Sequence, residues 1–381
     1  MENIDMARSE NNLNAVFTDT ANAIRAKTDT TATICPRDFA DKINSISSGG
    51  GMKAFFDAGG KCAYSSVTTF DGIINYSDTE NVTSFDNMFY NCNLITEVPN
   101  VNFSNAKRSK ACFANCGALG TANITIPSGV MYNMFDSCYK LTDLNVINTN
   151  VKDRIDCSYF ARMTNSLQTA NLNIPMASNF YYAFYESGVI SANLGVLHKQ
   201  TGENIDGTTD SYGIDYSSAF EKCSKLENVT LDIGSMVENN TSNYITLYRA
   251  FCGNPYSTTE KTATLNITFL NADANVYRMF DEAFINNSNI VSLPAVNCAT
   301  SYGLNTAFKG CINLEELKFY NIVSSIYLKD CTKMTREALV EVLNNLATVT
   351  ETRKCTLGET NLAKLTDEDK AIATNKGWTL L

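Results

Sequence analysis

One side-chain pattern recurs along most of the 381-residue chain. A phenylalanine is followed three positions later by a cysteine or another small or polar residue, and then by aliphatic residues at further steps of three. Clear copies begin at Phe89, Phe135, Phe220, Phe284 and Phe308, and Phe113 begins a shorter one. Successive copies lie roughly 23 residues apart, which is typical of solenoid repeats. A unit of this size cannot bury its own apolar edge, so the copies are expected to stack.

Other copies are weaker. Those headed by Phe160, Phe184 and Phe251 carry Met163, Ser187 and Asn254 at the cysteine position, and Leu328 heads a last copy with leucine in place of phenylalanine. The three steps from Phe184 to Phe284 are longer than the others and predict insertions. Polar stretches suited to such insertions lie at residues 201–210, 238–243 and 254–261.

Periodicity changes inside each unit. A bulky apolar residue stands four positions before the phenylalanine, as Met131 does before Phe135, and this spacing favours a short helical turn. Later in the unit apolar residues alternate, as at Leu144 and Val146, which indicates a strand with one buried face. The sequence therefore predicts an α/β repeat solenoid with short helical turns and parallel strands.

These units resemble the BspA-like class of bacterial leucine-rich repeats over about residues 85–335. The resemblance implies the solenoid fold and an adhesive role. Residues 49–84 are interpreted as a linker, which starts at Gly49-Gly50-Gly51, followed by the N-terminal cap of the solenoid. Residues 336–381 are interpreted as the C-terminal cap, with helices that begin after Thr335 and Thr366.

Residues 1–48 show helical spacing of apolar residues and are interpreted as a helical anchor or oligomerisation module. The strings at 21–28 and 38–46 resemble a short module of structural proteins from phages of Gram-positive hosts. Strings at 357–366 and 376–380 resemble the ends of phage and prophage repeat proteins. A helical hairpin that caps the first repeats is the alternative interpretation of the N-terminal segment.

Composition excludes several classes of function. The net charge of −10 disfavours binding to nucleic acid, and no apolar stretch is long enough to predict insertion in a membrane. The N-terminus lacks the pattern of a signal peptide. His198 is the single histidine, and no phosphate-binding glycine motif is present, so we expect no enzyme activity, no metal site and no cofactor.

Two sets of residues are singled out. One is a ladder of buried thiols, one per coil, at the shared cysteine position: Cys92, Cys116, Cys138, Cys223, Cys311 and Cys331. The other is the candidate binding face, on the exposed side of the strands: Asn145, Thr230, Asp232, Lys318 and Tyr320. Tyrosine and asparagine side chains are suited to binding sugars or proteins.

The first functional hypothesis is a phage virion protein of a tail fibre or baseplate, assembled in the host cytoplasm, which attaches the virion to a glycan or protein of the bacterial surface. Its residues 1–48 would contact other virion proteins and form a homo-oligomer, for which a trimer is favoured. The alternatives are an adhesin of the bacterial cell surface and a structural decoration protein of a virion that binds no receptor.

Overall fold

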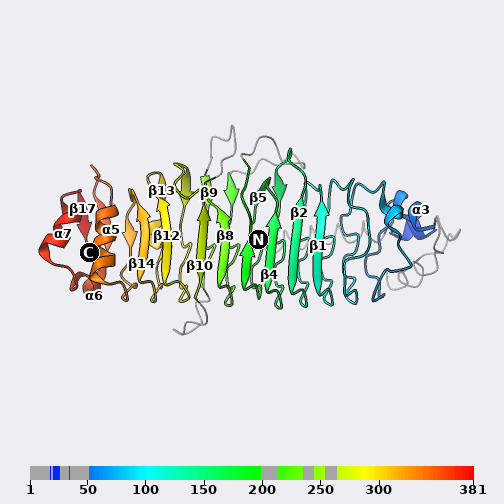
Figure 1. The fold of residues 1–381 in the computed structure, drawn as a ribbon, viewed down its shortest axis with the longest axis horizontal. Helices are drawn as coiled ribbons and strands as arrows, with labels where there is room; N and C mark the ends of the chain where they lie inside the picture. Colours follow the sequence, from blue (N-terminus) through cyan, green and yellow to red (C-terminus); the bar gives the residue numbers. More distant parts are fainter. Residues whose placement is uncertain are drawn as a thin grey trace.

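Parallel strands stack side by side along the long axis of the molecule, with α3 at one end and α5, α6 and α7 at the other (Figure 1). The computed structural model describes residues 51–198, 213–234, 244–253 and 264–381, together with residues 18, 20–25 and 34. The predicted module at residues 1–48 therefore lies almost wholly outside the described residues, and all three predicted insertions lie outside them. The predicted α/β repeat solenoid is confirmed.

Six successive coils each contribute one strand to a sheet of longer strands, called here the long-strand sheet. Its strands are, in spatial order, β1 (Thr121–Ile126), β2 (Asp143–Asn148), β4 (Thr169–Asn173), β6 (Ser191–Asn193), β8 (Asn228–Asp232) and β10 (Asn266–Leu270). β12 (Ser292–Asn297) and β14 (Glu316–Tyr320) form a further parallel pair. Alternation along each strand follows the prediction, because Leu144 and Val146 are buried while Asp143 is exposed.

A second parallel sheet, of shorter strands, lies just before the phenylalanine in six successive coils, from that of Phe160 to that of Phe308. It consists of β13 (Ser301–Tyr302), β11 (Tyr277–Met279), β9 (Tyr244–Thr246), β7 (Ile214–Asp215), β5 (Ala177–Asn179) and β3 (Ile155–Asp156). The apolar faces of both sheets and the phenylalanines belong to one continuous buried cluster. Burial of each large side chain contributes about 1.5–3 kcal/mol, so the core is made of many similar increments along the axis.

Between the short strand and the next long strand, the chain turns twice in succession. In the coil of Phe89, the amide of Met88 donates to the carbonyl of Phe85, and the amide of Cys92 donates to that of Phe89. The predicted helical turn is an α-helix at α4 (Leu304–Ala307), whereas the corresponding stretches of most other described coils form such paired turns. Paired turns leave every second amide free to bond the next coil, as Phe89 does to Cys112 and Asn91 to Ala114.

The phenylalanines of successive coils stack on one another. Ring centroids lie 5.4 Å apart between Phe89 and Phe113 and 5.5 Å between Phe113 and Phe135, with nearly parallel planes. A second run of stacked rings joins Phe184, Phe220, Phe251, Phe284 and Phe308, with centroids 5.2–5.7 Å apart. Such pairs add about 0.5–1.5 kcal/mol each beyond the burial of their area.

The two runs are separated by a coil whose register differs from the prediction. From Phe89 to Phe284, the amide of each stacked phenylalanine donates to the residue just before the next anchor, and Phe135 donates to Phe160. Ala161, and not Phe160, therefore occupies the anchor position, and Thr164, and not Met163, occupies the cysteine position. Phe160 instead packs edge-on against Phe135, at 76° between ring planes. Because Phe160 and Ala161 are both apolar, the spacing of the sequence alone could not show which of them is the anchor.

The first described turns lie inside the predicted linker and cap. α3 (Gly51–Asp57) begins at a glycine of the expected linker, and η2 (Tyr76–Thr79) follows. Between these two elements, the amides of Cys62 and Tyr64 already donate to the coil of Phe89, at Met88 and Tyr90. Stacking of coils therefore starts before residue 85.

The C-terminal segment closes the other end. α5 (Arg336–Asn345) begins after Thr335, whose hydroxyl accepts from the amide of Ala338, and α7 (Asp367–Thr374) begins after Thr366 with a reciprocal contact to Asp369. The remaining elements are β15 (Ile326–Tyr327), β16 (Arg353–Thr356), α6 (Gly358–Leu362) and β17 (Trp378–Leu380). Buried Trp378 donates from Nε1 to the carbonyl of Ala347. These helices and strands follow the last coil directly, as expected for a cap.

Candidate binding surface

The predicted thiol ladder lies inside the solenoid and has a hydrogen-bonding role. All six of its cysteines are buried. Each Sγ lies within hydrogen-bonding distance of a carbonyl oxygen in the preceding coil: 3.2 Å from Cys116 to Phe89, 3.1 Å from Cys138 to Phe113 and 3.0 Å from Cys311 to Phe284, for example. At Asn287, an amide donates to Phe251 in the same way, at 2.7 Å. The position therefore requires a small donor that satisfies a carbonyl oxygen.

Burial leaves these thiols without reactive character. Desolvation raises the pKa of Cys92, Cys223 and Cys331 to about 12, and that of Cys311 well above its usual range. The thiolate is the nucleophilic and metal-binding form, so none of these groups is poised for chemistry near neutral pH. In the part of the chain that the structure describes, no group of three or more histidine, cysteine or acidic residues is arranged to hold a metal ion.

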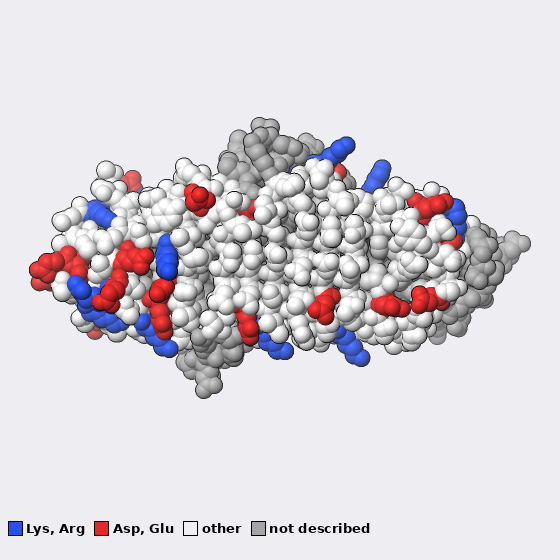
Figure 2. All heavy atoms as spheres, in the orientation of Figure 1, with Lys and Arg blue, Asp and Glu red and all other residues white. Residues whose placement is uncertain are grey.

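Three of the five predicted face residues lie on the outer side of the long strands. Asn145 belongs to a row that the strand register aligns with Asn123, Asn171, Asn193, Thr230 and Thr268. Asn145 donates to the side-chain oxygen of Asn123 across 2.8 Å, so part of this row is satisfied internally. Exposed Lys318 lies 3.4 Å from Glu316 on β14. The middle of the face shown in Figure 2 carries few charged side chains.

The prediction for Asp232 is wrong, because this side chain is fully buried. Its carboxylate accepts from the amides of Leu197 and Gly234 and from the side chain of Asn271. Chain segments that follow β6 and β10 thus cover Asp232, the last residue of β8, although its position faces outward. The alternation of residues along the strand could not predict this burial. Tyr320 is half-buried at the end of β14, opposite Asn297. The structure therefore does not bring these two residues together with Asn145.

A different surface stands out on the turns, and we call it the turn surface. It consists of the side chains up to three residues before and two residues after each anchor. In most coils, the residues two before and two after the anchor have left-handed backbone conformations, with φ of the non-glycine residues from 48° at Ala111 to 62° at Lys222. This region favours glycine and asparagine and is unfavourable for bulky side chains.

The residues in these left-handed positions change along the solenoid. The coils of Phe89, Phe113 and Phe135 hold small or amide side chains: Asn87, Asn91, Ala111, Asn115, Asn133 and Ser137. The coil before them differs, because Tyr64 has a left-handed conformation there, with φ of 62°. Later coils hold mostly large or charged ones: Tyr159, Met163, Tyr182, Glu186, Lys222, Arg249 and Glu282. The fold is satisfied by the small residues, so the large ones need another explanation.

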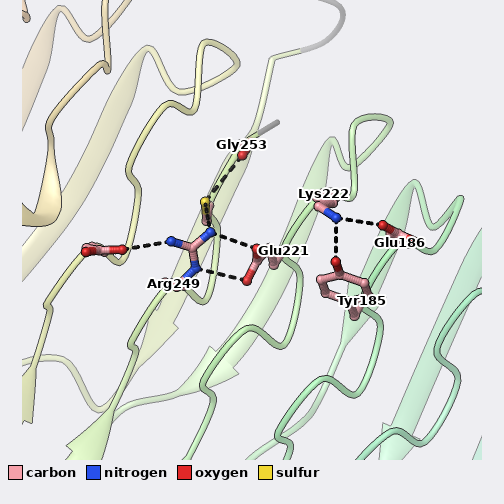
Figure 3. A network of polar contacts seen from close by, with 8 residues as sticks. Tyr185, Glu186, Glu221, Lys222, Arg249 and Gly253 are labelled. Atoms are coloured by element: carbon pink, nitrogen blue, oxygen red, sulfur yellow. Dashed lines mark hydrogen bonds and ion pairs between the residues drawn. The ribbon is translucent and has the colours of Figure 1, made fainter. Parts of the chain in front are cut away.

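Ion pairs connect the charged residues of this surface from coil to coil (Figure 3). Arg249 pairs bidentately with Glu221, at 2.9 and 3.2 Å, and reaches Glu282 at 2.8 Å. Lys222 binds Glu186 at 2.7 Å and also donates to the hydroxyl of Tyr185. Because these contacts favour the charged forms, the pKa of Arg249 and that of Lys222 lie above their usual values.

Tyrosines gather beside these pairs, and we call Tyr159, Tyr181, Tyr182 and Tyr185 the tyrosine patch. The ring of Tyr182 is central: its centroid lies 5.6 Å from Tyr159, 4.4 Å from Tyr181 and 4.7 Å from Tyr185. All four side chains are half-buried. Desolvation raises the pKa of Tyr181 and Tyr185, so both hydroxyls stay protonated and able to donate. Sequence analysis missed this patch; its signal was Tyr159 and Tyr182 at turn positions where earlier copies carry asparagine.

One comparison with known proteins identifies the repeat. Six copies of a family described as "BspA type Leucine rich repeat region" match residues 63–191 and 258–366, together more than half of the chain. No curated protein shares significant sequence similarity with it. Among solved structures, it is similar to a leucine-rich cell surface protein from Faecalibacterium prausnitzii A2-165. The two are 15% identical, with 62% of this chain and 76% of that chain covered and a TM-score of 0.23, too low to carry an argument.

Proposed function

Because the chain belongs to the BspA-type leucine-rich repeat family, we propose that it is an adhesive protein that binds a ligand on a biological surface. The carrying observation is the change at the left-handed turn positions, from Asn87 and Asn133 in the coils of Phe89 and Phe135 to Tyr182, Lys222 and Arg249 in later ones. Curved stacks of coils offer extended surfaces for partners, and residues that the fold does not require there are candidates for contact.

The proposed location is the surface of a bacterial cell. The adhesive roles of this class of repeat support it. The virion location predicted from the terminal strings finds no support in the comparisons, and the segment at residues 1–48 that would attach to other virion proteins or form a trimer lies largely outside the described residues. No helix in the described ranges is long and apolar enough to cross a membrane.

Location can be tested separately from binding. Antibody labelling of intact producing cells is expected to detect the protein, whereas co-sedimentation with purified virions would overturn the cell-surface proposal. Light scattering of the full chain at micromolar concentration tests the trimer prediction, which a monomer would contradict.

Binding can be tested with the labelled full chain on panels of bacterial and epithelial cells. We expect saturable, selective binding that is lost when Tyr182→Asn and Lys222→Asn are combined. The matched control combines Asn145→Ala and Thr230→Ala on the long strands and is expected to retain binding. Loss only in the control would move the site to the strand face, and no saturable binding to any surface would overturn the adhesive function.

A further inference from the structure

The tyrosine patch is the central part of a row of side chains that crosses three coils. Arg162 lies over the ring of Tyr159, with its Cζ 5.0 Å from the ring centroid, and Lys222 lies over Tyr185 with Nζ at 4.7 Å. Between these ends, Tyr182 stacks on Tyr159 with ring planes 10° apart. The result is a row of aromatic rings that passes from Tyr159 in one coil to Tyr182 and Tyr185 in the next, with a cation at each end.

Both end cations are compensated by carboxylates. Arg162 makes two hydrogen bonds to Asp136, at 2.9 and 3.0 Å, and Lys222 lies 2.7 Å from Glu186. The row thus offers no excess positive charge to an anionic ligand such as a nucleic acid or a sulfated polymer. It offers carboxylate oxygens, cationic donors and tyrosine hydroxyls, in fixed positions, beside apolar ring surface.

An uncharged sugar matches this combination. Its hydroxyl groups both donate and accept, so they can bond to carboxylates, guanidinium groups and phenolic hydroxyls. Its carbon-bearing faces are apolar enough to pack on tyrosine rings, which present large contact area at low conformational-entropy cost. The direction of the row, from coil to coil, suits an oligosaccharide rather than a single sugar.

We propose that the tyrosine patch, with Arg162 and Lys222 at its ends, binds a neutral glycan whose chain runs along the solenoid axis. The proposal rests on the adhesive function and names its ligand class. It also explains why Tyr159 and Tyr182 stand in left-handed backbone conformations, with φ of 54° at each, that earlier coils assign to asparagine.

The test is titration calorimetry of the full chain with soluble neutral glycans: glucan, galactan, mannan and chito-oligosaccharides. Heparin and polygalacturonate serve as anionic comparators. We expect saturable binding to at least one neutral glycan, with affinity changed less than about threefold between roughly 50 and 500 mM NaCl. Tyr182→Asn is expected to weaken binding about tenfold or more, because it removes the central ring.

The choice of variants separates a loss of binding from a loss of folding. Asparagine occupies the same left-handed position at Asn87 and Asn133, so Tyr182→Asn is compatible with the backbone. Tyr182→Phe keeps the ring and is expected to retain affinity within about threefold. Tyr139→Asn changes an exposed tyrosine at a corner outside the patch and is expected to bind like the unaltered protein.

The outcomes separate the two proposals. Adhesion to cells without affinity for any neutral glycan, or glycan binding that Tyr182→Asn leaves unchanged, overturns the glycan site while the adhesive function stands. Preference for heparin or polygalacturonate with strong salt dependence also overturns it. Glycan binding that depends on Tyr182 but brings no adhesion to cells supports the site and contradicts the adhesive function.

Discussion

The thiol of Cys223 donates a hydrogen bond to the carbonyl oxygen of Phe184 across 2.9 Å, from one coil to the coil before it. The donor follows its own anchor by three residues, and the acceptor is the preceding anchor. This relation ties the two most regular positions of the repeat together. It explains why the position holds cysteine, serine, threonine or asparagine, which are small donors, rather than an aliphatic residue.

Replacing this donor is expected to destabilise the solenoid locally. Cys223→Ala leaves the buried carbonyl of Phe184 without its partner and opens a small void, so we expect a loss of about 1–2 kcal/mol. Cys223→Ser keeps a donor, as Ser187 does in the preceding coil, and is expected to lose less than half as much. Urea unfolding followed by circular dichroism measures both, and equal losses would argue against the hydrogen bond as the reason.

The buried thiols are expected to resist labelling in the folded protein. Burial raises the pKa of Cys138 and Cys157 above its usual range and that of Cys355 to about 12. A raised thiol pKa means that the neutral form persists to high pH, so a thiolate-dependent reagent should react slowly at pH 8. All twelve described cysteines should react only after unfolding in guanidinium. Rapid reaction of several thiols per native chain would contradict the buried ladder.

The coil at Ala161 gives a test of register. Ala161→Phe places a ring where the neighbouring coils carry one, but Phe160 already fills adjacent space, so overpacking should lower stability by about 1–3 kcal/mol. Adding Phe160→Ala to this variant removes the competing ring and is expected to recover part of the loss. Thermal unfolding of the two variants measures the effect. Full tolerance of the single change would mean that Phe160 does not block the anchor site.

The stability of the fold is expected to depend strongly on the buried guanidinium of Arg278. It is fully buried and donates to the carbonyl oxygens of Ile233 at 2.7 Å, Asn297 at 2.9 Å and Ala274 at 3.0 Å. Arg278→Met leaves these oxygens unsatisfied and should destabilise by about 3 kcal/mol. Arg278→Lys cannot reach all three and should recover little.

The matched control is Arg353→Met, because Arg353 is more than a third exposed and pairs with exposed Glu351. We expect a change of less than about 1 kcal/mol there. Urea midpoints are the measurement, and similar losses at Arg278 and Arg353 would show that the buried contacts contribute no more than a surface ion pair.

The fold could be predicted because the same sequence pattern recurs in many copies of the repeat. A phenylalanine that stacks and a small donor three residues later recur together, so errors in one copy do not obscure the rest. The register at Ala161 could not be predicted, because Phe160 and Ala161 are both apolar and only the hydrogen bonds between coils distinguish them.

The candidate site was harder, since it depends on contacts between coils. Asp232 follows the alternation of an exposed strand residue, yet it is buried by Asn271 and by the segment that contains Leu197. The tyrosine patch combines side chains from two coils. Lys222 at one end comes from the next coil, and Asp136, which pairs with Arg162 at the other end, comes from the coil before. No spacing within one repeat brings these residues together.

The left-handed turn positions separate two tasks that a globular core usually combines. Their amides hold one coil to the next, as Tyr182 does at Ser217, while most of their side chains are partly exposed. An asparagine such as Asn133 can therefore be replaced by a tyrosine such as Tyr182 in one coil during evolution without disturbing the neighbouring coils. Ligand preference could then diverge among related chains through substitutions at a few turns, while the scaffold, its length and its order of coils stay the same.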